Sequence, residues 1–275
     1  MLKSQFIIII LSIVAVIFLF SLPKVVVNNK QVDAQRDKPQ SAVASKDKPQ
    51  VVHSISLPEE EQKRINTLRT QFENFSDKQK RLIFADSLAE IFRKFHLYDS
   101  SSSYSMKVAE IAPSVKNWIK AGMAYYEAAS STTDAEQIAG NSAKARELYN
   151  KALTVEPENL GIKNKIAATY MVNNDAMAAV VVLREIIQKD PANKQALTSL
   201  GLLSIQSGQF DKAIERFEKI LSLDPEDPTA CFYLGVAYVS KGDKSKGKSY
   251  LLKAKELSAD PAFNESVDAY MKELK

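Results

Sequence analysis

Few side chains in this sequence are of types that could carry out chemistry. The chain has two histidines, His53 and His96, and one cysteine, Cys231. A zinc site needs three or four His, Cys or carboxylate ligands at characteristic spacings, and neither histidine has such neighbours. The sequence also has no glycine-rich phosphate loop, no nucleophile elbow and no CxxC pair. We therefore expect no enzymatic activity, no metal, no cofactor and no small-molecule substrate.

The charge distribution argues against a nucleic-acid partner. Residues 1–56 carry seven Lys or Arg and three Asp, whereas the remaining residues carry 30 charges of each sign. A protein that binds nucleic acid usually presents a basic face to the phosphates, and a globular part with balanced charges has no excess for that purpose.

Three prolines recur at a fixed interval. Pro157, Pro191 and Pro225 are 34 residues apart, in the contexts VEPEN, KDPAN and LDPED. Two residues after each proline stands Asn159, Asn193 or Asp227, and these residue types are good helix N-caps. Proline ends the preceding helix because it lacks a backbone N–H donor. A period of this length predicts stacked helical hairpins.

Small residues recur where the two helices of each hairpin must approach closely. A larger side chain at such a position would push the helix pair apart. In the expected first helices these residues are Gly122, Ala167, Gly201 and Gly235. In the expected second helices they are Ala145, Ala179, Ala213 and Gly247.

This pattern resembles the tetratricopeptide repeat family. The clearest unit begins with Trp118, continues through Ala121-Gly122 and Tyr125, and ends at Pro157. The family prefers leucine where Ala121 stands. The resemblance implies an all-α solenoid of about four to five hairpins with capping helices. The N-terminal transmembrane helix discussed below is expected separately, from the composition of the first residues. We assign the repeats to residues 114–260 and a C-terminal capping helix to 261–275.

Two regions depart from the regular pattern. Residues 56–113 are expected to hold N-terminal helices and a degenerate repeat, with Ser101 and Ser105 where the family usually has alanine and an aromatic residue. Pro113 and Pro157 are 44 residues apart, and the surplus falls in residues 129–142. That insertion could lengthen a hairpin or form a polar loop.

The N-terminus has the composition of a membrane segment. Phe6 to Leu22 contains seventeen residues without a charge, about 25 Å of helix, which is near the lower limit for a bilayer span. A cleaved signal peptide is the alternative, but the apolar run is long and no small-residue cleavage site follows it directly. We expect residues 1–22 to be an uncleaved single-pass anchor and residues 23–55, with DKPQ repeated, to be a disordered tether.

Two sequence features give opposite predictions for the side of the membrane on which the C-terminal part lies. A strict count of flanking positive charges keeps the C-terminal part in the cytoplasm. A short basic N-terminal region before a long apolar run favours export, to the periplasm in a bacterial source. We expect export and leave the orientation open.

The resemblance also implies a candidate binding groove, because in this family the first helices line the concave face. Apolar side chains on a face that the hairpin core does not need favour an interaction surface. In the degenerate unit the same positions hold Asp86, Glu90 and Arg93. The candidate partner-binding residues are Ile119, Met123, Tyr126, Asn164, Met171, Leu202, Ile205, Phe232 and Val236.

These observations predict a membrane-tethered scaffold that binds a partner protein or peptide in the concave groove. Two alternatives stay open. One is an accessory subunit of a membrane-associated assembly or maturation complex, and the other is a structural spacer that only self-associates.

Overall fold

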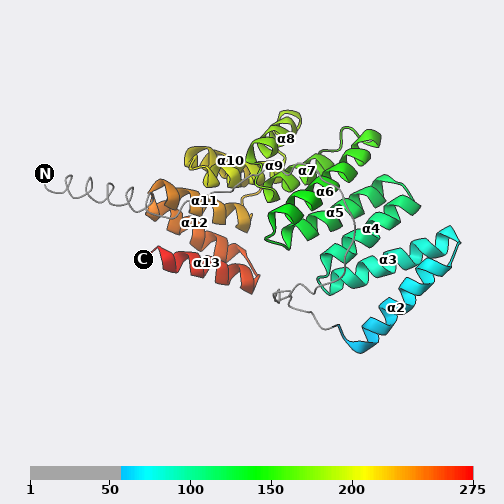
Figure 1. Cartoon of the computed structure of the whole chain (residues 1–275). Coiled ribbons are helices and arrows are strands. Elements are labelled where there is room, and N and C mark those ends of the chain that lie inside the picture. Colours follow the sequence, from blue (N-terminus) through cyan, green and yellow to red (C-terminus); the bar gives the residue numbers. More distant parts are fainter. Residues whose placement is uncertain (1–56, 275) are drawn as a thin grey trace, which may run out of the picture. The chain divides into compact units, whose positions relative to one another are not determined.

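The computed structural model describes residues 57–274, and this range consists of helices joined by short turns (Figure 1). There is no strand among these residues. The helices are α2 (Glu59–Asn74), α3 (Lys78–Lys94), α4 (Tyr98–Ile111), α5 (Val115–Ser130), α6 (Ala135–Val155), α7 (Leu160–Val172), α8 (Ala176–Lys189), α9 (Lys194–Gln206), α10 (Phe210–Leu223), α11 (Pro228–Lys241), α12 (Lys244–Leu257) and α13 (Pro261–Glu273).

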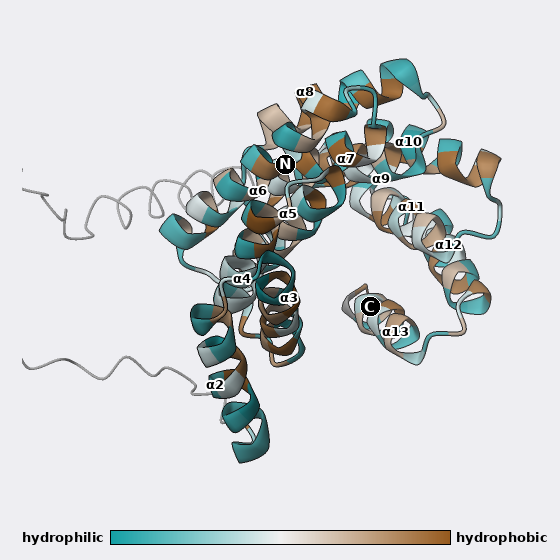
Figure 2. Cartoon of the chain, turned by 90° about the vertical axis from the view of Figure 1, so that its right-hand side faces the viewer, coloured by the Kyte–Doolittle hydropathy of each residue, from teal (hydrophilic) through white to brown (hydrophobic). Residues whose placement is uncertain are grey.

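Consecutive helices pair into five hairpins, α3/α4, α5/α6, α7/α8, α9/α10 and α11/α12. The second helix of each hairpin packs on the first helix of the next, and the first helices α5, α7, α9 and α11 also contact one another in turn. α2 packs on α3 and α13 on α12, and the hairpins between them follow an arc (Figure 2). The expected all-α solenoid of four to five hairpins with capping helices is confirmed for these residues.

The turns between hairpins use the caps that the sequence predicts. Asn159, Asn193 and Asp227 each accept a hydrogen bond from a backbone N–H in the first turn of α7, α9 and α11. Pro228 follows at the start of α11, where a missing N–H leaves no bond unmade. The proline-marked turns therefore fix where each hairpin begins.

Close approach of the two helices defines the core of each hairpin. The ring of Phe217 lies so close to Gly201 that a Cβ atom built there would be 2.5 Å from Cζ. At Gly122 a Cβ would be 2.6 Å from Cε1 of Tyr149. Both rings are almost fully buried. A glycine on one helix thus makes room for a large side chain on the other.

The insertion at residues 129–142 lengthens the α5/α6 hairpin. α6 has 21 residues, whereas α8, α10 and α12 each have 14. Only a short turn separates Ser130 from Ala135, and Asp134 caps α6 by accepting a hydrogen bond from the N–H of Gln137. Of the two expectations, the longer hairpin is the one observed.

The predicted N-terminal segments lie outside the described residues. The anchor at 1–22 and the tether at 23–55 therefore stay predictions. Within residues 57–274, no helix combines the length and the hydrophobicity that crossing a bilayer requires.

Replacing Gly201 with alanine should test the close approach at the hairpin core. We expect Gly201→Ala to lower the free energy of unfolding by about 1–3 kcal/mol, because the added methyl group meets the buried Phe217 ring. Chemical denaturation followed by circular dichroism measures the change.

Gly140→Ala is the matched control, because a Cβ at Gly140 in α6 meets nothing within 4 Å. It should raise the free energy of unfolding by about 0.5–1 kcal/mol, the usual gain in helix propensity. Equal effects of the two substitutions would contradict the close approach.

Candidate functional site

A pocket of about 170 Å³ opens between α3, α4 and α5, and we call it the α3–α5 pocket. Its inner wall is made of small side chains, Ala89 of α3, Ser101 and Ser105 of α4 and Ala124 of α5. Ile119 and Met123 of α5 supply apolar surface, and five charged side chains of α3 and α5 also line the pocket, namely Glu90, Arg93, Lys116, Lys120 and Glu127.

The pocket exists because one large side chain is missing from the repeat pattern. Ser105 stands eight residues before Pro113, and the same place relative to the turn proline holds Tyr149, Leu183 and Phe217 in the following hairpins. Those three side chains are at most 1% exposed and fill the space between their helices. A serine at this place leaves that space empty in the α3/α4 hairpin.

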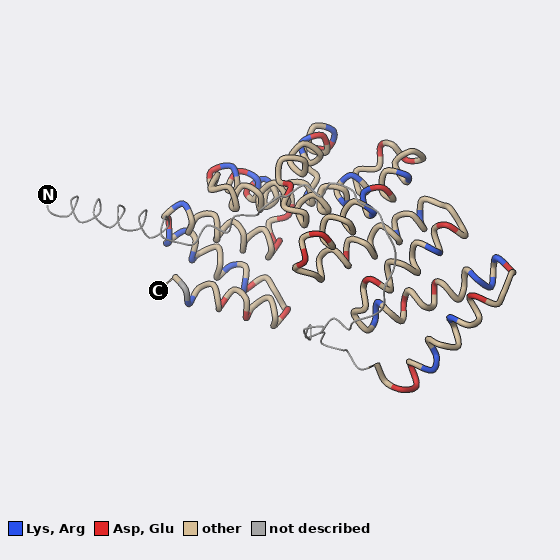
Figure 3. Tube along the Cα trace, in the orientation of Figure 1, with Lys and Arg blue, Asp and Glu red and all other residues tan. Residues whose placement is uncertain are grey.

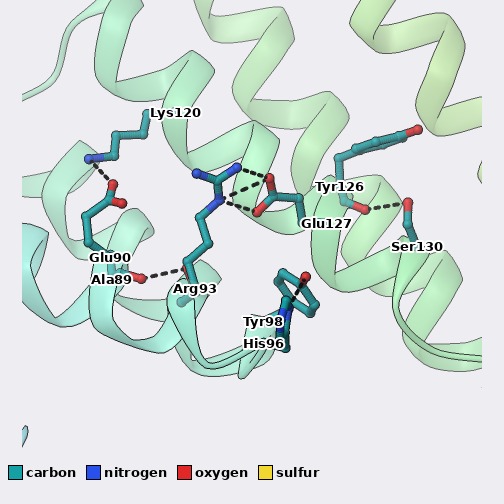
Figure 4. Close-up of polar contacts among 10 residues, drawn as sticks. Ala89, Glu90, Arg93, His96, Tyr98, Lys120, Tyr126, Glu127 and Ser130 are labelled. Carbon is teal, nitrogen blue, oxygen red and sulfur yellow. Dashed lines mark hydrogen bonds and ion pairs between the residues drawn. The ribbon is translucent and has the colours of Figure 1, made fainter. Parts of the chain in front are cut away.

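Lys120 links α5 to α3, the first helix of the preceding hairpin, at one side of the pocket. Its Nζ lies 2.6 Å from Oδ1 of Asp86 on α3. It also lies 2.9 Å from Oε1 of Glu90 on the same helix (Figure 4). Burial lowers the pKa of Lys120, but hydrogen bonds with the two carboxylates outweigh it, and the pKa is raised overall. The ammonium group therefore stays charged at neutral pH.

Arg93 and Glu127 form a second bridge between α3 and α5. Arg93 Nε donates to Glu127 Oε2 at 2.9 Å and its second nitrogen, Nη2, donates to Oε1 at 2.7 Å (Figure 4). The hydrogen bonds and charge of Glu127 raise the pKa of Arg93. A two-point pairing of this kind fixes the orientation of both side chains. Four of the five charged side chains that line the pocket are thus paired within the chain, Arg93 with Glu127 and Lys120 with Glu90.

The structure places seven of the predicted groove residues on the first helices with at least part of their surface accessible. Ile119 and Met123 line the pocket, and Met123 is 38% exposed. The half-buried residues are Tyr126 on α5, Met171 on α7, Leu202 and Ile205 on α9, and Val236 on α11. The prediction that these residues contact a partner stays a prediction.

Two predicted groove residues are engaged within the chain. Asn164 is 4% exposed, and its Nδ2 donates to Oδ1 of Asn193 at 3.1 Å. The ring of Phe232 packs edge-on against Phe263 and Tyr270 of α13, with centroids 5.9 and 6.0 Å apart. The capping helix therefore occupies the surface around Phe232.

The sequence pattern placed Asp86, Glu90 and Arg93 on the face of the first helix but did not predict their ion pairs with α5. Arg93 and Glu127 are 34 residues apart, as are Asp86 and Lys120, so each pair joins the first helices of consecutive hairpins. Opposite charges one repeat apart on first helices were the signal that could have identified these contacts.

The described residues offer little for catalysis. No group of three or more His, Cys, Asp or Glu side chains in residues 57–274 is arranged to hold a metal ion. His96 pairs with Tyr98 through Nδ1 at 2.8 Å from the phenol oxygen. Cys231 is fully buried in α11, and burial raises the pKa of its thiol. Lys and Arg residues and Asp and Glu residues are scattered over the described helices (Figure 3).

Part of the chain matches a known repeat family. Residues 204–265 match the family described as "Tetratricopeptide repeat". The chain is 27% identical over 129 residues to superkiller complex protein 3 of Mus musculus, which covers 46% of this chain and 8% of that protein. It is 23% identical over 117 residues to the BBSome complex member bbs-4 of Caenorhabditis elegans, covering 42% of this chain and 25% of that protein. The chain thus spans a quarter or less of these relatives.

Among solved structures, the fold is similar to the crystal structure of the MamA protein. The TM-score is 0.48 at 23% identity, over 64% of this chain and 91% of MamA.

Filling the α3–α5 pocket should stabilise the protein. In the α7/α8 hairpin, Ala167 and Leu183 belong to the same buried cluster, so leucine is a suitable residue to place beside Ala89. We expect Ser105→Leu to raise the free energy of unfolding by about 0.5–2 kcal/mol by filling the space. Ser103→Leu, on the exposed face of the same helix, should change it little, and thermal unfolding compares the two.

The thiol of Cys231 should be inert in the folded chain. Because it is the single cysteine of the sequence, its reaction with a disulfide reagent reports on α11 alone. We expect slow modification in buffer and rapid modification in denaturant, since the thiolate form is suppressed and access is blocked. Rapid reaction under native conditions would contradict the packing around α11.

Proposed function

We propose that this chain, a tetratricopeptide repeat protein, is a non-catalytic scaffold that binds a partner protein or peptide on the face formed by its first helices. The observation that carries the proposal is the α3–α5 pocket, an apolar cavity with a paired, charged rim. Binding there would bury apolar surface of Ile119 and Met123, which is the main favourable contribution to protein association.

The pocket supports a partner that inserts one apolar side chain. Its inner wall is lined with the small residues Ala89, Ser101 and Ser105. A branched aliphatic or small aromatic side chain of the partner therefore has space here, at the place where the other hairpins have a large side chain of their own. The rim would then order the partner's backbone or charged side chains, because the ion pairs of Lys120 and Arg93 are already formed. Pre-ordered groups lose little entropy on binding.

The rest of the groove would extend the contact along α7 and α9. Met171, Leu202 and Ile205 retain accessible apolar surface on these helices. A standard interface buries about 800 Å² on each partner, which is more than one pocket of this size supplies. We therefore expect the partner to be an extended or helical segment that spans several hairpins.

Tethering to a membrane is part of the proposal. The charge-free run from Phe6 to Leu22 and the polar segment at 23–55 support a single-pass anchor followed by a spacer. We propose that the repeats are exported, to the periplasm in a bacterial source. Protease treatment of intact cells and of spheroplasts tests this, because an exported repeat domain is digested without lysis.

An accessory role in an assembly is the second candidate. The two relatives described above are named as members of complexes, and such a role would use the same groove to hold another subunit. Co-purification with a defined set of stoichiometric subunits would favour it. The third possibility, a self-associating spacer, predicts a mass that rises with concentration in light scattering of the full chain.

Blocking the pocket without unfolding the protein tests the proposed function. Crosslinking and affinity purification from native membranes should recover at least one partner with the wild-type chain that is lost with Ser105→Leu. The reason is that the leucine side chain would fill the pocket that the partner's side chain occupies. Quantitative mass spectrometry of the captured proteins measures the loss.

Ser103→Leu is the matched control and should capture the same proteins as wild type, since Ser103 is exposed on the opposite side of α4. Capture that is unchanged by Ser105→Leu, with folding confirmed by circular dichroism, would refute the pocket as the binding site.

A further inference from the structure

A second groove lies between the second helices of two consecutive hairpins. It is lined by residues of α8 and α10, with the C-terminal half of α9 at its base, and has a volume of about 350 Å³. We call it the α8–α10 groove. None of its lining residues belongs to the α3–α5 pocket or to the groove residues predicted from the sequence.

The α8 side of this groove exposes apolar surface that the fold does not use. Met177 is 84% exposed and Val181 is 59% exposed, one helical turn apart on α8. Both line the groove together with Leu203 of α9. Figure 2 shows α8 with a high proportion of hydrophobic residues. Adjacent exposed apolar side chains beside a groove are typical of a protein-binding surface.

The charged residues of the groove are all cations. They are Arg184 on α8 and Lys212 and Arg216 on α10, and no Asp or Glu lines the groove. Arg216 is half-buried, and its Nη1 donates to the carbonyl oxygen of Leu200 at 3.3 Å and to the hydroxyl of Ser204. Lys212 donates to the amide oxygen of Gln209 at 2.7 Å. Within residues 57–274, none of the three cations forms an ion pair.

Nearby acidic residues do not neutralise these cations. Glu185 follows Arg184 in the chain, but its carboxylate faces Lys163 of α7 at 3.6 Å. Asp211 precedes Lys212 and pairs with Lys241 of α11 at 2.5 Å. Burial lowers the pKa of Arg216, and although Glu215 offsets part of this effect, Arg184 adds to it. A half-buried guanidinium held near another cation gains from an added carboxylate.

We propose that the α8–α10 groove is a second docking site, which binds a peptide segment of a partner protein that combines acidic and apolar side chains. The carboxylates would pair with Arg184 and Arg216, and the apolar side chains would cover Met177 and Val181. The complementarity of charge selects this occupant, because an apolar peptide alone leaves the cations unpaired and a basic peptide is repelled.

The site would give the scaffold two independent contacts on different sides of its hairpins. The first helices carry the α3–α5 pocket, whereas the α8–α10 groove opens between second helices. Two ligands, or two segments of one ligand, can therefore bind without competing for the same side chains.

Selection from a random peptide display library on the purified full chain tests the proposal. Selected peptides are synthesised with a fluorophore, and their affinities are measured by fluorescence anisotropy. We expect a class of peptides that contains Asp or Glu beside apolar residues. Their affinity should fall at least about tenfold for both Met177→Glu and Arg184→Glu, which change exposed side chains and leave the hairpin cores intact.

Two control variants match these changes. Ile83→Glu alters an apolar residue that is 53% exposed on α3, and Lys219→Glu reverses an exposed charge on α10 outside the groove. Both should bind the selected peptides as wild type does. Ser105→Leu should also leave them unaffected, which separates this site from the α3–α5 pocket.

The proposal is overturned if the selected peptides lack acidic residues. It is also overturned if their affinities for Met177→Glu and Arg184→Glu equal those for wild type, or if no selected peptide depends on these two residues. Peptides whose binding depends on Ser105 instead would support the first site and count against the second.

Discussion

The structure depends on how closely the two helices of each hairpin approach. Glycine or alanine on the first helix faces a large side chain on the second, as Gly201 faces Phe217 and Gly122 faces Tyr149. Each such pair sets the spacing within a hairpin, and the next hairpin packs on the surface that this spacing creates. Because repeats contact mainly their neighbours, a local change in one pair alters the surface locally and leaves distant repeats unchanged.

The α3–α5 pocket follows from one departure from that rule. Ser105 is too small to fill the place that Tyr149 and Phe217 fill in later hairpins. The α3/α4 hairpin keeps its position through the packing of α4 on α5, and the ion pairs of Lys120 and Arg93 add links between α3 and α5. A space that side-chain packing closes in the later hairpins therefore stays open here, and a repeat that is degenerate in sequence supplies a pocket at this place.

Several elements were predictable because they depend on residues close in sequence. The prolines and the caps at Asn159, Asn193 and Asp227 set the start of three hairpins, and cap geometry is local. The candidate groove was only partly predictable. Its residues share a helical period, but burial of Asn164 against Asn193 and packing of α13 on Phe232 depend on elements distant in the chain. Periodicity identifies a face of a helix and does not reveal what covers it.

The sequence by itself determined the class of the protein. Its 34-residue period and its small residues at helix crossings indicate an α-solenoid. Only the tertiary structure decided where an empty space and unpaired charges remain. The α3–α5 pocket needs three helices, and the cations of the α8–α10 groove are unpaired because nearby carboxylates face Lys163 and Lys241. Such features arise from the directions in which side chains meet across helices, and a one-dimensional pattern does not contain those directions.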